Sequence, residues 1–201
     1  MRFEHDAKPT RREHEHTEAG RHRAMRRADR EVTDAARIGE IIARCDIVHV
    51  AYEDAEGLAV VPLNLAYEYD AATGALTLWF HSASRGRKMD AMRAAGNALP
   101  VAFAMETDCE VTEGRTLCNW GEAFASVAGT GVASLVADDD LETRRKALAL
   151  LMAHAAHIDH AEFTDAQVRA VAIWKVAVDH LTCKVRPKPS PVHMRSETPM
   201  E

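Results

Sequence analysis

The chain contains 201 residues, of which 47% are hydrophobic and 28% charged, with 25 Lys and Arg against 31 Asp and Glu. This length suits one domain, and the hydrophobic fraction is sufficient for a core. No apolar run approaches the roughly 20 residues of a membrane helix, and the composition excludes collagens, coiled coils and disulfide-rich miniproteins.

The charge is unevenly distributed along the chain. The net charge is −6, yet residues 1–30 carry nine Lys and Arg against six Asp and Glu. The acidic remainder argues against a nucleic-acid-binding protein, which usually presents a basic face. Because residues 1–30 are polar and lack hydrophobic periodicity, we expect a mobile N-terminal tail. They also lack the apolar segment of a secretory signal, so we expect a cytoplasmic protein without membrane partners.

The four cysteines are widely spaced, at Cys45, Cys109, Cys118 and Cys183. None forms a Cys-x-x-Cys pair, and no export signal indicates an oxidising compartment, so we interpret them as reduced thiols. For each of them, a small residue of the core or of a strand is the favoured interpretation.

Short strands and turns dominate the first half of the predicted domain, residues 31–186. A helix with three isoleucines on one face follows the candidate cap Thr33-Asp34. Strands are predicted at residues 47–52, 58–69 and 76–80, with glycine-containing turns at 54–57 and 70–74. Pro62 has no N–H group to donate and should therefore lie at a sheet edge or a bulge.

The second half continues the antiparallel pattern. The predicted elements are a short helix at 89–93, strands at 99–105 and 122–136, a helix at 141–152, strands at 171–178 and 181–185, and a mobile tail at 187–201. Because short turns join successive strands, neighbouring strands should be antiparallel. About six such strands would form a mainly β, α+β domain that closes toward a barrel. Gly129-Thr130-Gly131 lies inside a predicted strand and not before a helix, which disfavours a dinucleotide-binding fingerprint.

One segment concentrates groups that bind phosphate. Between the strand end at Phe80 and the next helix, the chain places His81, Ser82, Ser84, Arg85, Gly86, Arg87 and Lys88. Hydroxyl donors, arginine, lysine and the free N–H groups of a helix N-terminus are the groups that hold phosphates in proteins. A solvated basic turn is the alternative interpretation of the same residues.

The stretch VVPLNLAYEYDAATGALTLWFHSASRGRKMDAMR resembles the FMN-binding core of the pyridoxamine 5'-phosphate oxidase-like split-barrel superfamily. Its pattern VPLN…FHSA…GRK, followed by Trp120 and SVAGTG, is most similar to the nitroimidazole reductase group. The resemblance covers residues 51–131 and extends more weakly over 141–152 and 181–184. It implies a homodimer of FMN-binding split β-barrels, with FMN bound at the interface between the subunits.

The resemblance also implies roles for individual residues. His81 and Ser82 match the pair of residues that meets the flavin and its phosphate. Arg87 and Lys88 match the two cations that bind this phosphate. Val61, Pro62, Leu63 and Asn64 match the strand whose backbone borders the isoalloxazine. Ser126 matches a position that reaches the cofactor from the other subunit. The Arg-x-His substrate motif of the vitamin-oxidising members has no counterpart near the C-terminus, which disfavours oxidation of pyridoxamine phosphate.

These observations lead to the hypothesis of an FMN-dependent oxidoreductase. It would take reducing equivalents from an external donor and pass them to a small, nitroaromatic acceptor, with the flavin supplying the chemistry and the protein its orientation. His81 is the candidate catalytic residue, as a donor to the acceptor or the flavin. Two alternatives stay open: an FMN-binding carrier or sensor without turnover, and a haem-binding split-barrel relative.

No metal site is predicted. The three histidines His154, His157 and His160 recur at a spacing of three, but no fourth ligand is indicated, and a solvated helix end is favoured. The histidines of the N-terminal segment could bind metal ions only weakly, as any histidine-rich tract can. They are His5, His14, His16 and His22.

Overall fold

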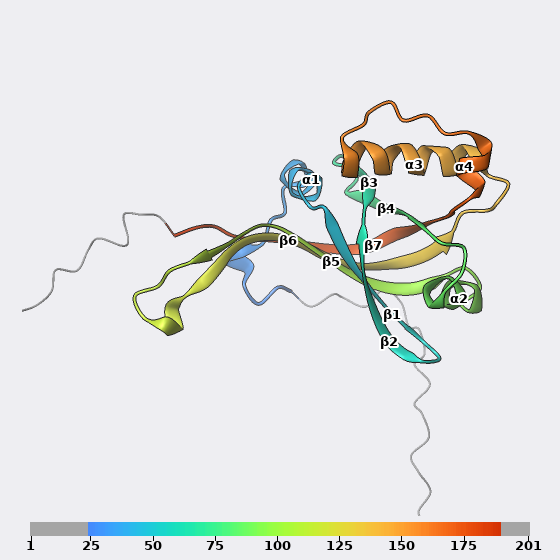
Figure 1. Ribbon diagram of the computed structural model, residues 1–201. Coiled ribbons are helices and arrows are strands. Elements are labelled where there is room, and N and C mark those ends of the chain that lie inside the picture. The colour runs from blue at the N-terminus through green and yellow to red at the C-terminus, as the bar shows by residue number, and fades with distance from the viewer. Residues whose placement is uncertain (1–23, 190–201) are drawn as a thin grey trace, which may run out of the picture.

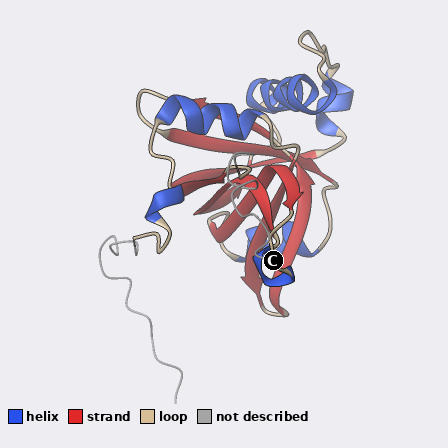
Figure 2. Cartoon of the chain, turned by 90° about the vertical axis from the view of Figure 1, so that its left-hand side faces the viewer, coloured by secondary structure: helices blue, strands red, loops and turns tan. Residues whose placement is uncertain are grey.

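The computed structural model describes residues 24–189 as a seven-stranded antiparallel sheet flanked by helices (Figures 1 and 2). The strands are β1 (Ile47–Asp54), β2 (Gly57–Asn64), β3 (Ala66–Asp70), β4 (Ala75–Ser82), β5 (Leu99–Thr112), β6 (Gly121–Leu135) and β7 (Ala172–Arg186). The helices are α1 (Ala35–Ala43), α2 (Arg87–Ala94), α3 (Leu141–Ala156) and α4 (Asp165–Arg169), with short 3-10 helices η1 (Ala28–Arg30) and η2 (Leu117–Asn119). The predicted mainly β architecture is confirmed, with seven strands instead of about six.

The predicted tails lie largely outside the described residues. Residues 1–23, with the four N-terminal histidines, and residues 190–201 are not described. Within the segment expected to be the N-terminal tail, residues 28–30 form η1, and the following Glu31 bridges to Lys184 of β7. Across the described residues, no helix is both long and apolar enough to cross a membrane.

Strands β2 and β3 follow each other in sequence, yet they form the two opposite edges of the sheet, whose order is β2-β1-β5-β6-β7-β4-β3. Only Leu65, which is fully buried, separates the end of β2 from the start of β3. One residue spans about 3.6 Å at most, so the two edges must approach each other here, and the sheet must curl around its core. The prediction of one strand over 58–69 is therefore wrong, although the predicted edge position of Pro62 is confirmed.

Strands β5 and β7 are longer than the hydrophobic pattern predicts, whereas the bounds of β6 differ from the prediction by one residue at each end. Strand β7 joins the two strands predicted at 171–178 and 181–185, and the irregularity between them is a register shift against β6 at Thr130/Gly131. Strand β5 continues beyond the expected end at Met105 to Thr112, where its side chains become mostly exposed. There β5 and β6 leave the core as a two-stranded arm (Figure 1).

The glycines of β6 have a packing role. A Cβ atom at Gly129 would collide with the carbonyl oxygen of His180, and one at Gly131 with the carbonyl oxygen of Ala177. Both carbonyls belong to β7, whose backbone approaches β6 closely around the register shift. The Gly-Thr-Gly sequence thus serves the contact between two strands, in agreement with its placement inside a strand.

Helices α1, α3 and α4 begin where an acidic or hydroxyl side chain caps them. Asp34 accepts a hydrogen bond from the Arg37 backbone N–H at 2.8 Å, as the sequence predicts for the start of α1. At α3, Asp140 accepts from the Thr143 N–H at 3.0 Å. Helices α3 and α4 lie over β3 and β4 (Figure 1) and enclose a second, smaller core with Trp79. Helix α4 was not predicted, because its five residues are too short to show a hydrophobic period.

All four cysteines are free thiols, of which two are buried and two are exposed. Cys45 and Cys183 are buried, as expected, and burial raises the pKa of Cys45 to about 12. Cys109 is a strand residue but exposed, and Cys118 is exposed in η2, so the expectation of a core or strand position is wrong for Cys118.

Replacing Ile42 by alanine should lower the free energy of unfolding by about 2–5 kcal/mol, because the side chain is fully buried and its loss leaves a cavity. Urea unfolding followed by circular dichroism measures this change. The control is Leu117→Ala in η2, where the side chain is 87% exposed and the expected change is within about 0.5 kcal/mol. Equal losses in the two variants would contradict the packing of α1 against the sheet.

Candidate functional site

The predicted phosphate-binding segment borders a cavity of about 580 Å³, which we call the loop cavity. It lies between the β1–β2 hairpin, the end of β4 and the first turn of α2. Its lining residues are Tyr52, Ala59, Val60, Val61, Ser82, Ala83, Arg85, Gly86, Arg87, Lys88 and Met89. The structure thus brings together four of the residues expected to contact a cofactor, namely Val61, Ser82, Arg87 and Lys88.

The loop is shaped by a strand end and a helix start. Strand β4 ends at Ser82, and α2 begins after Gly86, which has φ 118° and ψ 163°, a conformation that favours glycine. The Gly86 carbonyl accepts the N–H groups of Met89 and Asp90. The N–H groups of Arg87 and Lys88 precede these in the first turn, where helix geometry provides no backbone acceptor. This turn is therefore able to donate hydrogen bonds to an anion.

Among the described residues, Lys88 is a half-buried cation without an acidic partner. Its Nζ atom lies 5.1 Å from the centre of the Trp174 ring, a cation–π distance. Burial lowers the pKa of Lys88, because the charged form loses hydration. Among residues 24–189, no carboxylate oxygen lies within salt-bridge distance of this Nζ atom. An anion in the loop cavity would therefore supply a compensating charge that the described residues do not provide.

Ser82 is oriented by a buried tryptophan that the sequence analysis did not single out. The Trp174 ring is 1% exposed, stacks on Phe80 at a centroid distance of 4.2 Å, and donates from Nε1 to the Ser82 Oγ atom at 3.1 Å. Since the hydroxyl oxygen accepts this bond, the Ser82 proton remains available for a ligand. The pairing of Phe80 with Trp174 across β4 and β7 creates the arrangement, and the sequence pattern does not specify that register.

Arg87 makes an ion pair that the sequence analysis did not foresee. Its Nε and Nη2 atoms donate to the two carboxylate oxygens of Asp54, both at 2.8 Å, and Nη2 also donates to the Gly57 carbonyl at 2.9 Å. These hydrogen bonds lower the pKa of Asp54 and raise that of Arg87. The pair fastens the β1–β2 hairpin to α2. Arg85, by contrast, is exposed at the cavity, so it is a cation able to reach a phosphate.

The remaining predicted residues do not line the loop cavity. Because side chains alternate along a strand, the exposed His81 lies on the opposite face of β4 from Ser82. The same alternation in β2 leaves Pro62 and Asn64 exposed and directs Leu63 toward the core. Ser126 is half-buried in β6, where it pairs with Glu106 and Lys184 in the neighbouring strands.

The histidines near the end of α3 have separate surroundings. His154 Nε2 lies 2.8 Å from the Cys45 carbonyl oxygen, and its ring meets Tyr67 edge-on at 5.3 Å. His157 follows the helix in a left-handed conformation, and His160 lies beyond it. In the part of the chain that the structure describes, no group of three or more His, Cys, Asp or Glu residues could hold a metal ion.

Comparison with known proteins identifies the family to which this curled sheet belongs. The family model described as pyridoxamine 5'-phosphate oxidase matches residues 34–185. The chain belongs to this family. The match confirms the resemblance seen in the sequence, and it covers nearly all of the described domain, from the cap of α1 to the second-last residue of β7. A search of curated proteins gave no match.

Solved structures support the same fold for this family member. A candidate 5-nitroimidazole antibiotic resistance protein from Bacteroides thetaiotaomicron is 31% identical, with a TM-score of 0.61, over 77% of this chain and 86% of that protein. A FAD and heme binding protein from Mycobacterium smegmatis is 16% identical (TM-score 0.64, 84% and 80% covered). A flavocytochrome from Azotobacter vinelandii is 17% identical (TM-score 0.66, 87% and 79% covered). The last two share the fold at low identity.

Replacing Asp54 by asparagine should destabilise the protein at neutral pH, and the difference should fade in acid. Arg87 holds the pKa of Asp54 below its usual value, so the ion pair stabilises the fold above the unfolded-state pKa, about 3.9. This contribution is lost as the pH falls through the lower folded-state pKa. Urea unfolding of both proteins from neutral pH to about pH 2.5 measures the effect. A difference that does not change with pH would contradict the ion pair.

Proposed function

We propose that this protein is an FMN-dependent oxidoreductase that passes reducing equivalents from an external donor to a small nitroaromatic acceptor. The observation that carries the proposal is Lys88, a half-buried cation that borders the loop cavity without a carboxylate partner among the described residues. A buried charge is costly unless an opposite charge joins it. The phosphate of FMN, with about two negative charges near neutral pH, provides that charge.

The residues of the loop cavity fit the phosphate end of FMN. Lys88 and Arg85 supply cations, the Ser82 hydroxyl supplies a proton, and the first turn of α2 supplies N–H groups. Val61 and the buried Tyr52 supply an apolar part of the cavity wall. When bound, FMN would provide the hydride or electron transfer itself. Arg87 acts indirectly in this proposal, because its pair with Asp54 holds the hairpin wall in place.

The acceptor class rests on the sequence relationship. The 31% identical structure is described as a candidate 5-nitroimidazole antibiotic resistance protein, and a nitro group is a small acceptor of electrons. Two structural neighbours are described as a FAD and heme binding protein and as a flavocytochrome. Haem binding is therefore the alternative to FMN binding that the experiment must test. An absorption spectrum separates these possibilities directly.

We further propose that the protein is a homodimer and that its second chain completes the cofactor site. Across β2, β1, β5 and β6, one face of the sheet is partly exposed in the single chain and carries small, mostly apolar side chains in rows. One row consists of Val60, Ala51, Ala102 and Thr130, and the next of Pro62, His49, Ala104 and Ala128. Val60 also lines the loop cavity, so a second chain on this face would border the cofactor. His81, which faces away from the loop cavity, would then act only at a site shared by two chains.

Replacing Lys88 by alanine should remove most of the bound flavin, because the phosphate loses its half-buried cation. The visible spectrum of the purified protein and titration with FMN measure the loss, expected to be about tenfold or more in affinity. The control is Lys175→Ala: this lysine also lies over a tryptophan ring, Trp79, at 5.5 Å, but does not line the cavity. Equal flavin retention in both variants would refute the proposed site, and a Soret band would support the haem-binding alternative.

Turnover is tested on the reduced flavoprotein. After anaerobic reduction of bound FMN, mixing with a nitroimidazole should reoxidise the flavin faster than buffer alone, with the Lys88→Ala protein as the flavin-poor control. A quinone serves as a second acceptor in parallel. Reoxidation at the buffer rate with both acceptors would favour a flavin-binding carrier or sensor over an enzyme.

Replacing Ala102 by arginine should convert the dimer to a monomer, because a charge would be buried at the centre of the proposed interface. Light scattering after size-exclusion chromatography measures the mass in solution. Ala102 is exposed in the single chain, so the fold should tolerate the change. The control is Ala155→Arg, at an exposed position near the end of α3. A wild-type monomer, or an unchanged mass in Ala102→Arg, would contradict this interface.

A further inference from the structure

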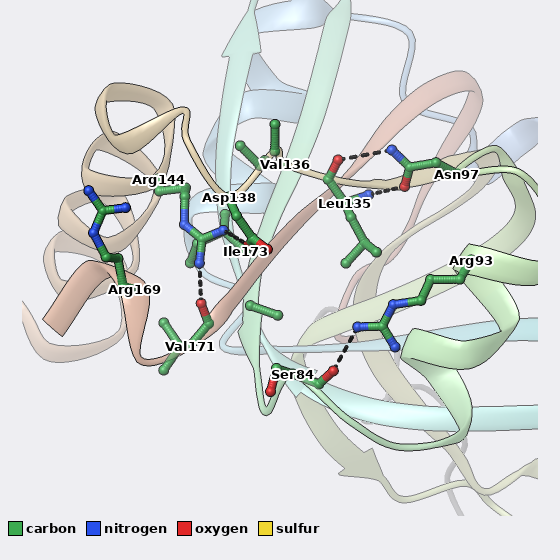
Figure 3. Close-up of a pocket in the computed structure, with 12 residues that line it drawn as sticks. Ser84, Arg93, Asn97, Leu135, Val136, Asp138, Arg144, Arg169, Val171 and Ile173 are labelled. Atoms are coloured by element: carbon green, nitrogen blue, oxygen red, sulfur yellow. Dashed lines mark hydrogen bonds and ion pairs between the residues drawn. The ribbon is translucent and has the colours of Figure 1, made fainter. Parts of the chain in front are cut away.

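A second cavity, of about 560 Å³, lies on the other side of the loop that follows β4 (Figure 3). We call it the arginine cavity. Helix α2 and the end of β6 form one wall, and α3, α4 and the start of β7 form the other. It shares no lining residue with the loop cavity, so FMN bound as proposed above would leave it open.

Three arginines from three different helices line the arginine cavity: Arg93 from α2, Arg144 from α3 and Arg169 from α4. The single acidic residue in its lining is Asp138. The local excess of positive charge is unusual in a chain with a net charge of −6. Because like charges that converge on one space repel each other, this arrangement favours an anion between them.

Arg144 is buried, and its hydrogen-bonding capacity is only partly used. The residue is 2% exposed; Nη1 donates to Asp138 at 2.6 Å, and Nη2 donates to the carbonyls of Val171 and Val168 at 2.5 and 3.3 Å. Its Nε atom is the buried side-chain atom without a hydrogen-bond partner among the described residues. A buried donor without a partner is costly, and the Asp138 side chain is fully exposed. The carboxylate is therefore a partner that another anion could replace.

The other two arginines are positioned to complete such a site. Arg93 donates from Nη2 to the Ser84 carbonyl at 2.7 Å and pairs through Nη1 with Asp90 at 3.0 Å, which fixes it on the α2 wall. The exposed Arg169 guanidinium, at the end of α4, makes no ion pair or hydrogen bond with the described residues. Figure 3 shows Arg144 and Arg169 on one wall and Arg93 on the other. Arg169 is thus free to turn toward a ligand.

We propose that the arginine cavity binds a small metabolite through an oxyanion, a phosphate or a carboxylate, held by Arg93, Arg144 and Arg169. The oxyanion would take the place of the Asp138 carboxylate on Arg144 and neutralise Arg169, while Arg93 keeps its pair with Asp90. Arginine suits this role, because its planar N–H groups match the oxygens of either anion. Apolar side chains, among them Val136 and Ile173, offer a surface for the carbon part of the ligand.

The test follows the arginine Nε–H signals by NMR while 15N-labelled protein, saturated with FMN, is titrated with inorganic phosphate or, separately, with acetate. The signal of Arg144 should move with a saturating dependence on the anion. Arg169→Ala should weaken binding by about tenfold, the loss expected for one charged hydrogen-bonding partner. Asp138→Asn should strengthen it, because the competing carboxylate is gone. Arg37→Ala, at an exposed position on α1, is the control and should bind like the wild-type protein.

The possible outcomes separate this site from the cofactor site. Tighter binding of phosphate than of acetate identifies the ligand group as a phosphate, and the reverse identifies a carboxylate. The titration is repeated without FMN in the Lys88→Ala protein, so that the result does not depend on the proposed cofactor. The proposal is overturned if neither anion moves the Arg144 signal, or if Arg169→Ala and Asp138→Asn bind the anion as the wild-type protein does.

Discussion

The single residue between β2 and β3 is the constraint on which the rest of the structure depends. Leu65 is fully buried and joins the two opposite edges of a seven-stranded sheet. The sheet must curl so that its edges approach each other, and the hairpin of β1 and β2 is thereby carried over to the end of β4. The loop cavity forms where these parts meet α2. Its geometry depends on the Asp54–Arg87 pair, which fastens the hairpin to that helix.

Much of this fold is readable from the sequence, because local signals determine it. Alternating apolar residues mark most of the strands, Asp34 marks the start of α1, and the missing N–H group of Pro62 marks an edge strand. The change of edge at Leu65 leaves no such signal, since the alternation is nearly continuous through it. The two-stranded arm also lacks a signal in the sequence, because the side chains of β5 beyond Met105 are mostly exposed and show no apolar period.

The sequence predicts the candidate site only in part, because contacts between distant segments leave no local signal. Hydroxyl and cationic residues before a helix indicate a phosphate site through composition alone, and Ser82 and Lys88 do line one cavity. Two features depend on contacts between distant segments: Trp174 orients Ser82 across 92 residues of sequence, and Asp54 engages Arg87 across 33. Two neighbouring cations, Arg87 and Lys88, therefore differ in function. Arg87 pairs with Asp54 and fastens the hairpin to α2, whereas Lys88 borders the cavity without an acidic partner among the described residues.

The loop between β4 and α2 has one further consequence. Ala83 and Arg85 line the loop cavity, whereas Ser84 between them lines the arginine cavity and is held there by Arg93. A few residues thus form a common partition, and a displacement of this loop toward one cavity would narrow that cavity and widen the other. Two ligands bound on either side of such a partition would influence each other's affinity equally, by thermodynamic reciprocity. The occupancy of the proposed flavin site would then depend on the concentration of a second, chemically different metabolite.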